Sequence, residues 1–156
     1  MKKVSIIMGS VSDYDVMSGA EQILTQFGVE YEKKVISAHR TLDFMVEYTR
    51  GAVDRGVGVI IAGAGGAAHL AGVAAGLTVL PVIGVPIMTK GLGGLDSLLS
   101  MVQMPSGIPV ATVAVNGSKN AALLAIEMLA IGDGALTEKL LQFRKEQADK
   151  DLSTVI

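Results

Sequence analysis

Residues 56–89 form a stretch without a single Asp, Glu, Lys or Arg. A charge-free stretch of this length fits either a helix that crosses a membrane or segments that are buried on both faces inside a globular core. Several residues interrupt the stretch: Gly63, Gly65, Gly66, His69, Gly72, Gly76, Pro81, Gly84 and Pro86. These interruptions favour a strand, a loop, a helix and a second strand in a buried core over one continuous membrane span.

Short apolar runs alternate with helical patterns along the whole chain. We predict strands over residues 4–8, 29–36, 57–62, 79–85 and 110–115. We predict helices over residues 13–27, 42–55, 70–76, 95–102, 120–131 and 134–150, with Ser12 and Thr41 as N-caps of the first two. This alternation predicts one α/β domain over residues 1–156, a three-layer αβα sandwich around a parallel sheet. Five strands suggest the flavodoxin-like order 2-1-3-4-5, and the last helix is an extra C-terminal one.

The composition excludes several classes of protein. The chain has no cysteine, which rules out a disulfide framework, a thiolate metal cluster and a cysteine nucleophile. Lys and Arg number 13 and Asp and Glu number 15, and the formal net charge of −2 argues against a nucleic-acid binder. The apolar run near the N-terminus is too short for the core of a signal peptide. We therefore expect a cytoplasmic protein that binds neither nucleic acid nor a membrane.

Polar residues follow the first predicted strand, at the edge where sheets of this order bind ligands. The hydroxyls of Ser10 and Ser12 and the free N–H groups of a helix N-terminus can bind phosphate, and Asp13 can bond ribose hydroxyls. The same residues also fit plain helix capping by Ser12, with Asp15 in the capping-box position and Asp13 in the first turn. The residues alone leave both interpretations open.

The two histidines of the chain, His39 and His69, both fall on predicted loops at strand ends. Histidine ordinarily titrates near neutral pH and can shuttle protons. Arg40, beside His39, offers a planar fork for a phosphate or a carboxylate. The alternative is a hydrogen-bonded structural histidine. No carboxylate or cysteine joins the histidines at a metal-ligand spacing, so we expect no metal and no other cofactor.

The loop after the third predicted strand contains the pattern Gly63-x-Gly65-x-x-Ala68, which fits a dinucleotide fingerprint. Such a site also needs an acidic residue about 20 positions on, and none lies between Asp54 and Asp96. The small residues instead favour a backbone that approaches a ligand closely or presents N–H groups to an anion or carbonyl. Close packing of a helix on a strand is the structural alternative.

Flavin carriers and phospho-receivers on the same fold match poorly. The strand-end loops contain no aromatic residue except Tyr14, and the third strand ends in Ala62-Gly63 where a receiver needs Asp.

Five segments stand in order along the chain: MGSVSD from residue 8, SAHRT from 37, AGAGGAAHL from 62, DSLLSMVQMP from 96 and NAALLA from 120. This joint pattern closely resembles the class I N5-carboxyaminoimidazole ribonucleotide mutases of bacterial purine biosynthesis, over nearly the whole chain. The resemblance implies conversion of N5-carboxyaminoimidazole ribonucleotide to 4-carboxy-5-aminoimidazole ribonucleotide on the route to IMP, without metal, ATP or biotin. It also implies a homo-octamer of flavodoxin-like subunits.

The resemblance assigns roles by motif match. His39 becomes the general acid/base that gives a proton to the exocyclic nitrogen and later takes one from the ring carbon. The pocket for the ribonucleotide and its carboxyl group would contain Ser10, Ser12, Asp13, Ser37, Arg40, Gly65, Gly66, Ala67 and His69. Gly and Ala walls would keep the freed carbon dioxide beside the ring. Leu42 and Ala71 replace two prolines of the family, which removes a fixed φ but no chemical group.

Two other functions stay open. Related class II enzymes carboxylate aminoimidazole ribonucleotide directly with carbon dioxide, and a regulatory module on the same fold would only bind a nucleotide. Arg40 and the run GGAAH at residues 65–69 favour class I.

The distribution of charge predicts an oligomer. Many charged residues cluster in the first two and the last predicted helices, and the mean hydropathy is +0.50. The remaining faces must be apolar, so we expect a closed homo-oligomer, an octamer, that buries them.

Overall fold

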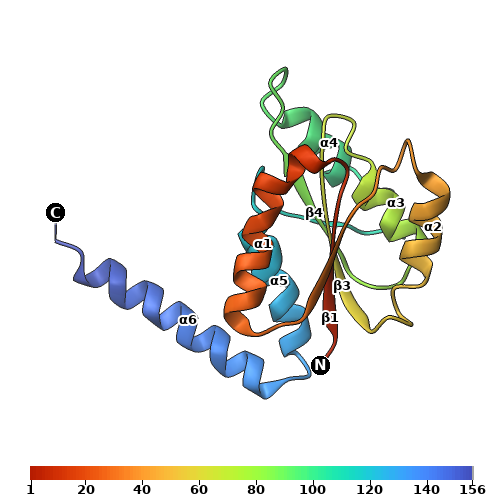
Figure 1. The fold of residues 1–156 in the computed structure, drawn as a ribbon. Coiled ribbons are helices and arrows are strands. Elements are labelled where there is room, and N and C mark those ends of the chain that lie inside the picture. The colour runs from red at the N-terminus through yellow and green to blue at the C-terminus, as the bar shows by residue number, and fades with distance from the viewer. Residues whose placement is uncertain (156) are drawn as a thin grey trace.

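The computed structural model describes residues 1–155 and has one sheet of five parallel strands at its centre (Figure 1). The strands are β1 (Lys3–Met8), β2 (Tyr31–Val35), β3 (Val57–Gly65), β4 (Val82–Ile87) and β5 (Ala111–Thr112). Their order is β2-β1-β3-β4-β5, and every neighbouring pair is parallel. This topology confirms the flavodoxin-like order predicted from the sequence.

Helices cover both faces of the sheet, which confirms the three-layer sandwich. They are α1 (Tyr14–Phe27), α2 (Leu42–Arg50), α3 (Leu70–Leu77), α4 (Leu95–Val102), α5 (Ser118–Ala130) and α6 (Gly134–Ser153). On one face α1 lies beside α5, and α6 packs against α5. The other face carries α2, α3 and α4, whose buried residues share one apolar cluster.

Each face has its own apolar core, because successive residues of a strand point to opposite sides. Ile6 and Ile61 belong to the cluster under α1 and α5, whereas their neighbours Ile7 and Ile60 belong to the cluster under α2, α3 and α4. Strands buried on both faces have no room for charged side chains. This burial explains why β3 and β4, within residues 56–89, contain no charge.

Gly63 leaves room on β3 for the side chain of Met17, a fully buried residue of α1. A Cβ atom at Gly63 would collide with the sulfur and Cε of Met17. At this position of the glycine pattern, the structural alternative of close helix–strand packing is therefore the correct one.

The predicted strand boundaries are wrong at several ends. β3 continues to Gly65 rather than stopping at residue 62, because Ala64 and Gly65 pair with Pro86 and Ile87 of β4. β4 begins at Val82 rather than at residue 79, and Val79 is almost fully exposed. β2 and β5 are shorter than predicted, since pairing stops before the apolar pattern does.

The predicted helix caps also need correction. Ser10, not Ser12, is the first cap, because a 3-10 turn (Val11–Asp13) precedes α1. The capping box joins Ser10 to Asp13, and Asp15 has no part in it. Thr41 does stand at the start of α2, but its hydroxyl bonds back to Ser37 instead of capping the helix.

The two positions where the family has proline lie in first helical turns. Leu42 is the first residue of α2 and half exposed, and Ala71 is the second residue of α3 and fully buried. Proline is tolerated at such positions because a helix has no partner for the first N–H groups. Both helices form here without it.

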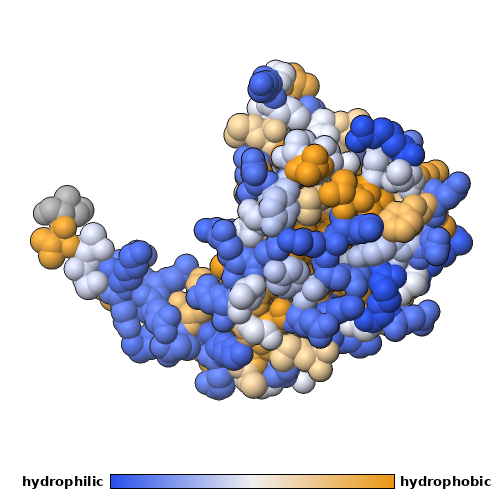
Figure 2. Space-filling view, in the orientation of Figure 1, coloured by the Kyte–Doolittle hydropathy of each residue, from blue (hydrophilic) through white to orange (hydrophobic). Residues whose placement is uncertain are grey.

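The last helix extends far beyond the body of the molecule (Figure 1). Only Leu136 and Leu140 of α6 are buried, and both lie in its first half. Figure 2 shows a largely hydrophilic surface on the projecting part, while apolar surface gathers on the body. No helix among residues 1–155 combines the length and the apolar character that crossing a membrane requires.

Candidate active site

A pocket of about 470 Å³ opens where the loops after β1, β2 and β3 meet. β1 lies between β2 and β3, so the chain crosses over in opposite directions on its two sides and leaves a crevice at the carboxyl edge. Its lining consists of Gly9, Ser10, Ser12, Asp13, Ser37, Ala38, His39, Arg40, Ala64, Gly65, Ala67, His69, Leu70, Ile87, Met88 and Thr89. All the site residues predicted from the sequence are in this lining except Gly66.

The loop after β1 contributes a network of short polar contacts. The Ser10 hydroxyl accepts a hydrogen bond from the Ser12 N–H at 3.3 Å and one from the Ser12 hydroxyl at 3.0 Å. The Ser10 N–H donates to Asp13 Oδ2 at 2.9 Å. Both sequence interpretations therefore meet here, because the residues that cap the turn also line the pocket.

Asp13 is the one acidic side chain of the pocket, and it is mostly buried. Burial raises the pKa of Asp13, and hydrogen bonds from the N–H groups of Ser10 and Gly9 offset only part of the rise, so its pKa lies above the ordinary value. A carboxylate whose burial is incompletely compensated gains from further donors. The hydroxyl groups of a ligand are donors of that kind.

The loop after β2 is a tight polar turn. The Ser37 hydroxyl accepts from the backbone N–H of Arg40 at 3.1 Å and lies 3.4 Å from its side-chain Nε. The Thr41 hydroxyl bonds both backbone groups of Ser37 at 3.0 Å. These bonds close the turn and hold His39 and Arg40 on its exposed outer side.

The two histidines meet across the pocket from different loops. His39 Nε2 lies 2.7 Å from His69 Nδ1, and the rings stand almost perpendicular with centroids 4.8 Å apart. A neutral ring nitrogen either donates or accepts, so one hydrogen must lie between these two atoms. The structure thus brings together two groups that can pass a proton, 30 residues apart in sequence.

The loop after β3 gives the pocket a wall of small residues. Ala64, Gly65 and Ala67 line it, and Gly65 lies against the backbone oxygen of Ile87. Gly66, between Gly65 and Ala67, is not part of the lining, and its backbone N–H donates to the Ser97 hydroxyl of α4. Contact of Gly66 with the substrate stays a prediction.

Residues after β4 also reach the pocket, and the sequence analysis missed them. Met88 and Thr89 line it, and the Thr89 hydroxyl donates to both carboxylate oxygens of Asp96 at 2.9 and 3.0 Å. A usable signal was their place after the fourth predicted strand, because the carboxyl ends of parallel strands share one edge of the sheet. Only the register of β4 against β3 shows how close the two loops come.

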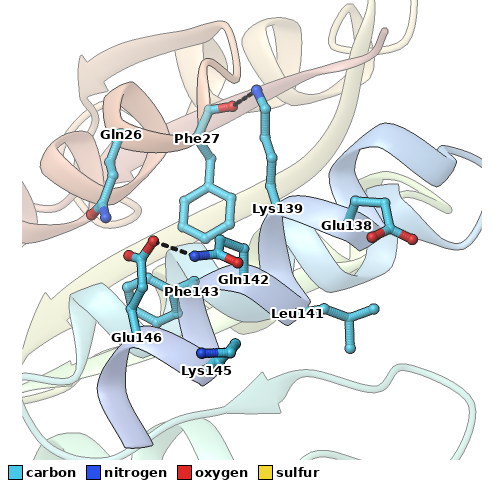
Figure 3. Close-up of a pocket in the computed structure, with 9 residues that line it drawn as sticks. All are labelled: Gln26, Phe27, Glu138, Lys139, Leu141, Gln142, Phe143, Lys145 and Glu146. Atoms are coloured by element: carbon cyan, nitrogen blue, oxygen red, sulfur yellow. Dashed lines mark hydrogen bonds between the residues drawn. The ribbon is translucent and has the colours of Figure 1, made fainter. Parts of the chain in front are cut away.

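A second hollow, of about 590 Å³, lies between the end of α1 and α6, far from the histidines (Figure 3). Phe27 and Phe143 meet there edge to face, and Lys139 bonds the backbone oxygen of Phe27. It exists because α6 leans away from the body. Its lining offers no group suited to proton transfer near neutral pH.

The pocket can do three things chemically. Its hydroxyls, Asp13 and Arg40 can hold a phosphorylated sugar, the histidine pair can move a proton, and the small-residue wall can enclose a small uncharged fragment. No group of three or more His, Asp or Glu within residues 1–155 could hold a metal ion.

Comparison with known proteins agrees with this chemistry. The sequence model described as AIR carboxylase matches residues 3–150. Similar curated proteins are the N5-carboxyaminoimidazole ribonucleotide mutases of Saccharolobus solfataricus (58% identical, covering 99% of this chain and 98% of the relative) and Pyrococcus abyssi (62%, covering 94% and 84%). That of Bacillus subtilis is 57% identical, covering 91% and 89%. The crystal structure of Treponema denticola PurE superposes with a TM-score of 0.88 at 30% identity, covering 97% of this chain and 95% of the other.

Proposed function

The chain belongs to the AIR carboxylase family, and we propose that it converts N5-carboxyaminoimidazole ribonucleotide to 4-carboxy-5-aminoimidazole ribonucleotide in purine biosynthesis, with His39 as the general acid/base. The observation that carries the proposal is the 2.7 Å contact between His39 and His69 at a wall of Ala64, Gly65 and Ala67. The reaction needs both a proton shuttle and an enclosed space for carbon dioxide, and they occur in one cavity.

The proton balance of the reaction needs one group that works in both directions. His39 first donates a proton to the exocyclic nitrogen, the C–N bond of the carbamate breaks, and carbon dioxide is released. The ring carbon then forms a bond to the carbon of carbon dioxide, and that ring carbon now bears both a hydrogen and a carboxylate. His39 finally removes this hydrogen as a proton, so the ring regains its aromaticity and the enzyme its starting state.

His69 serves His39 by setting where its hydrogens lie. His69 Nδ1 lies against His39 Nε2, so Nδ1 can accept the hydrogen on Nε2 until the exocyclic nitrogen of the substrate becomes the better acceptor. The contact also fixes the orientation of the His39 ring, whose side chain is otherwise exposed. We assign to His69 this orienting role in addition to contact with the substrate.

The ribonucleotide is held by the other two loops. Ser10 and Ser12, at the turn before α1, present their hydroxyl groups for the phosphate, and Asp13 accepts from ribose hydroxyls. Arg40 and Ser37 complete the anion site, since the Ser37 hydroxyl already lies beside the Arg40 side chain.

One comparison of substrates tests the function. Ultraviolet absorbance should show consumption of N5-carboxyaminoimidazole ribonucleotide by the purified protein in bicarbonate-free buffer. A parallel reaction contains aminoimidazole ribonucleotide and bicarbonate, and it should proceed far more slowly. Turnover only in the second reaction would identify a direct carboxylase. Binding without turnover in either would identify a regulatory module. Neither alternative is favoured, because the curated relatives carry the name mutase.

We also propose that the enzyme is a homo-octamer, working in the cytoplasm, in which neighbouring subunits cover the pocket. Leu95, Leu99 and Val102 form one stripe of α4, and each is about half exposed. Met88, which lines the pocket, is 59% exposed, and Leu92 beside it is 65% exposed. Apolar side chains gathered around the mouth of a site are expected to be buried by another subunit.

The projecting helix supports the same proposal. The outer half of α6 contacts nothing in its own subunit that would bury it, and the hollow beside it has apolar walls from Phe27, Leu141 and Phe143 (Figure 3). A 20-residue helix with few buried residues gains little stability alone. Packing against a second copy would supply the missing contacts.

A further inference from the structure

A buried serine of α4 joins two walls of the pocket without lining it. Ser97 is fully buried, and its hydroxyl donates to the backbone oxygen of Ile87 at 2.6 Å. The hydroxyl oxygen of Ser97 in turn accepts from the N–H of Gly66 at 2.9 Å. Ile87 ends β4 and Gly66 follows β3, so one hydroxyl ties the ends of two strands together.

Gly66 depends on α4 for its conformation. Ser100, one turn after Ser97, places its hydroxyl 3.2 Å from the Gly66 backbone oxygen and bonds the Asp96 oxygen at 2.7 Å. Gly66 has φ of +73°, and nothing lies within 4 Å of the place where a Cβ would be. Packing therefore does not determine this turn. Hydrogen bonds to α4 hold the most flexible type of residue in one conformation.

The position of Gly66 determines the position of the carboxyl pocket wall. Gly65 and Ala67, on either side of it, line the cavity, and Ile87 lines it from the opposite strand. Carbon dioxide is small and uncharged, so no charged group can retain it, and only the fit of the wall can. The ribonucleotide, in contrast, is held by charge and hydrogen bonds at the other two loops.

We propose that Ser97 is a positioning residue that keeps the Gly65–Ala67 wall closed while the carboxyl group migrates. The proposal rests on the mutase function above. When the carbamate C–N bond breaks, its electron pair stays on the protonated nitrogen and carbon dioxide is released. The ring carbon then captures the carbon dioxide, or the carbon dioxide escapes from the pocket and leaves aminoimidazole ribonucleotide behind. Ser97 favours capture by holding the wall in place.

The test compares wild type with Ser97→Ala and measures two products from N5-carboxyaminoimidazole ribonucleotide. These are 4-carboxy-5-aminoimidazole ribonucleotide and the decarboxylated aminoimidazole ribonucleotide, corrected for spontaneous decay. We expect the ratio of decarboxylated to carboxylated product to rise severalfold in Ser97→Ala. We expect kcat for the carboxylated product to fall by about tenfold or more, with little change in KM. The ratio does not depend on how much of the enzyme is folded.

Ser118→Ala is the matched control. Ser118 is also buried, and its hydroxyl also donates to a backbone oxygen, that of Val16, but it lies outside the pocket. We expect this variant to keep the wild-type ratio. Ser97→Cys, which has similar size and a weaker hydrogen-bonding group, should lie between wild type and Ser97→Ala. A wild-type ratio in both Ser97 variants, or an equal rise in Ser118→Ala, would overturn the proposal.

Amide hydrogen exchange separates this proposal from the function on which it rests. Exchange at residues 65–67 should be faster in Ser97→Ala than in wild type and unchanged in Ser118→Ala. If wild type converts no substrate, the mutase function fails. In that case, unchanged exchange at residues 65–67 in Ser97→Ala would refute the positioning role too. Faster exchange would show that Ser97 holds the loop after β3 even though the mutase function fails.

Discussion

At the scale of single residues, the proposed chemistry depends on one hydrogen between His39 Nε2 and His69 Nδ1. Both histidines are exposed, so substrate can reach either ring. The pair sits at the end of two different strands, which makes its geometry a property of the sheet rather than of one loop. His39 and its neighbour Arg40 share the loop after β2, and each can be tested by one substitution.

Replacing His39 with Asn should remove proton transfer while leaving binding largely intact. The side chain is exposed and outside both apolar cores, so the fold should not change. We expect turnover to fall by at least ~10²-fold, the usual scale for a lost general acid/base. Steady-state kinetics measure turnover, and calorimetry with the ribonucleotide product measures affinity. If turnover stays within a few-fold of wild type, His39 is not the proton shuttle.

Arg40→Lys should weaken substrate binding although the charge is kept. Lysine is a point charge without the planar fork that matches a phosphate or carboxylate, and it loses the Nε that lies beside Ser37. We expect KM to rise while kcat changes little, because the phosphoribosyl group is remote from the bonds that change. An unchanged KM in initial-rate measurements would remove Arg40 from the proposed site.

At the scale of elements, the edge strand β2 is tied to its neighbours by one carboxylate. Glu32 accepts hydrogen bonds from Tyr48 of α2 at 2.7 Å and from Arg55 at 3.0 Å, and it pairs with Lys3 of β1 at 2.9 Å. Partial burial acts to raise the pKa of Glu32, but the hydrogen bonds from Arg55, Tyr48 and Lys3 outweigh it and lower the pKa to about 2. Folding therefore favours the ionised form.

This pKa gives the third prediction, on acid stability. Because the folded pKa of Glu32 is lowered, its stabilisation is fully present above the ordinary pKa of 4.5 and is lost as pH falls towards 2. Between pH 5 and pH 2, the Tm of Glu32→Gln should fall less than the Tm of wild type. The two falls should differ by ~2–4 °C, the shift that about 1 kcal/mol produces in a domain of this size. Thermal melts across this range measure the difference.

Glu127→Gln is the control for the acid-stability prediction. Glu127 pairs with Arg144 on a more exposed surface, where an ion pair contributes little. We expect its pH profile to match wild type. Equal profiles for Glu32→Gln and wild type would show that the Glu32 cluster does not stabilise the fold through its charge.

The sequence predicted the order of elements and three of the four loops that meet at the pocket, for a physical reason. Buried parallel strands have a plain apolar pattern, and the carboxyl ends of β1, β2 and β3 must share one edge, which brings Ser10, His39 and His69 together. The wrong details, such as the N-cap at Ser12, depend on single hydrogen bonds. The roles of Thr89 and Ser97 depend on strand register, which no local pattern reveals.

At the scale of the whole molecule, apolar side chains are exposed on α4 and on the loop before it, and α6 extends away from the body (Figure 1). The proposed closed assembly would explain both features, because other subunits would cover them. A pocket that encloses carbon dioxide also needs a cover that the single subunit does not provide. Assembly and catalysis are therefore expected to depend on each other.

The fourth prediction is that light scattering coupled to size exclusion gives about eight subunit masses. Leu99→Glu places a charge in the exposed stripe of α4 and should dissociate the assembly, with loss of activity in the smaller species. Ile131→Glu, at an exposed residue between α5 and α6 and outside that stripe, provides a comparison. A monodisperse and fully active wild-type monomer would contradict the octamer and the shared site.

The central claim is that one carboxyl group moves from nitrogen to carbon inside one pocket. Its most direct test supplies N5-carboxyaminoimidazole ribonucleotide with ¹³C in the carboxyl group, in buffer that contains excess unlabelled bicarbonate. Mass spectrometry then measures the label in the product during the first turnovers. Our account predicts that the 4-carboxy product retains most of the ¹³C, because the released carbon dioxide does not leave the pocket. Product with the unlabelled carboxyl of the buffer would contradict it.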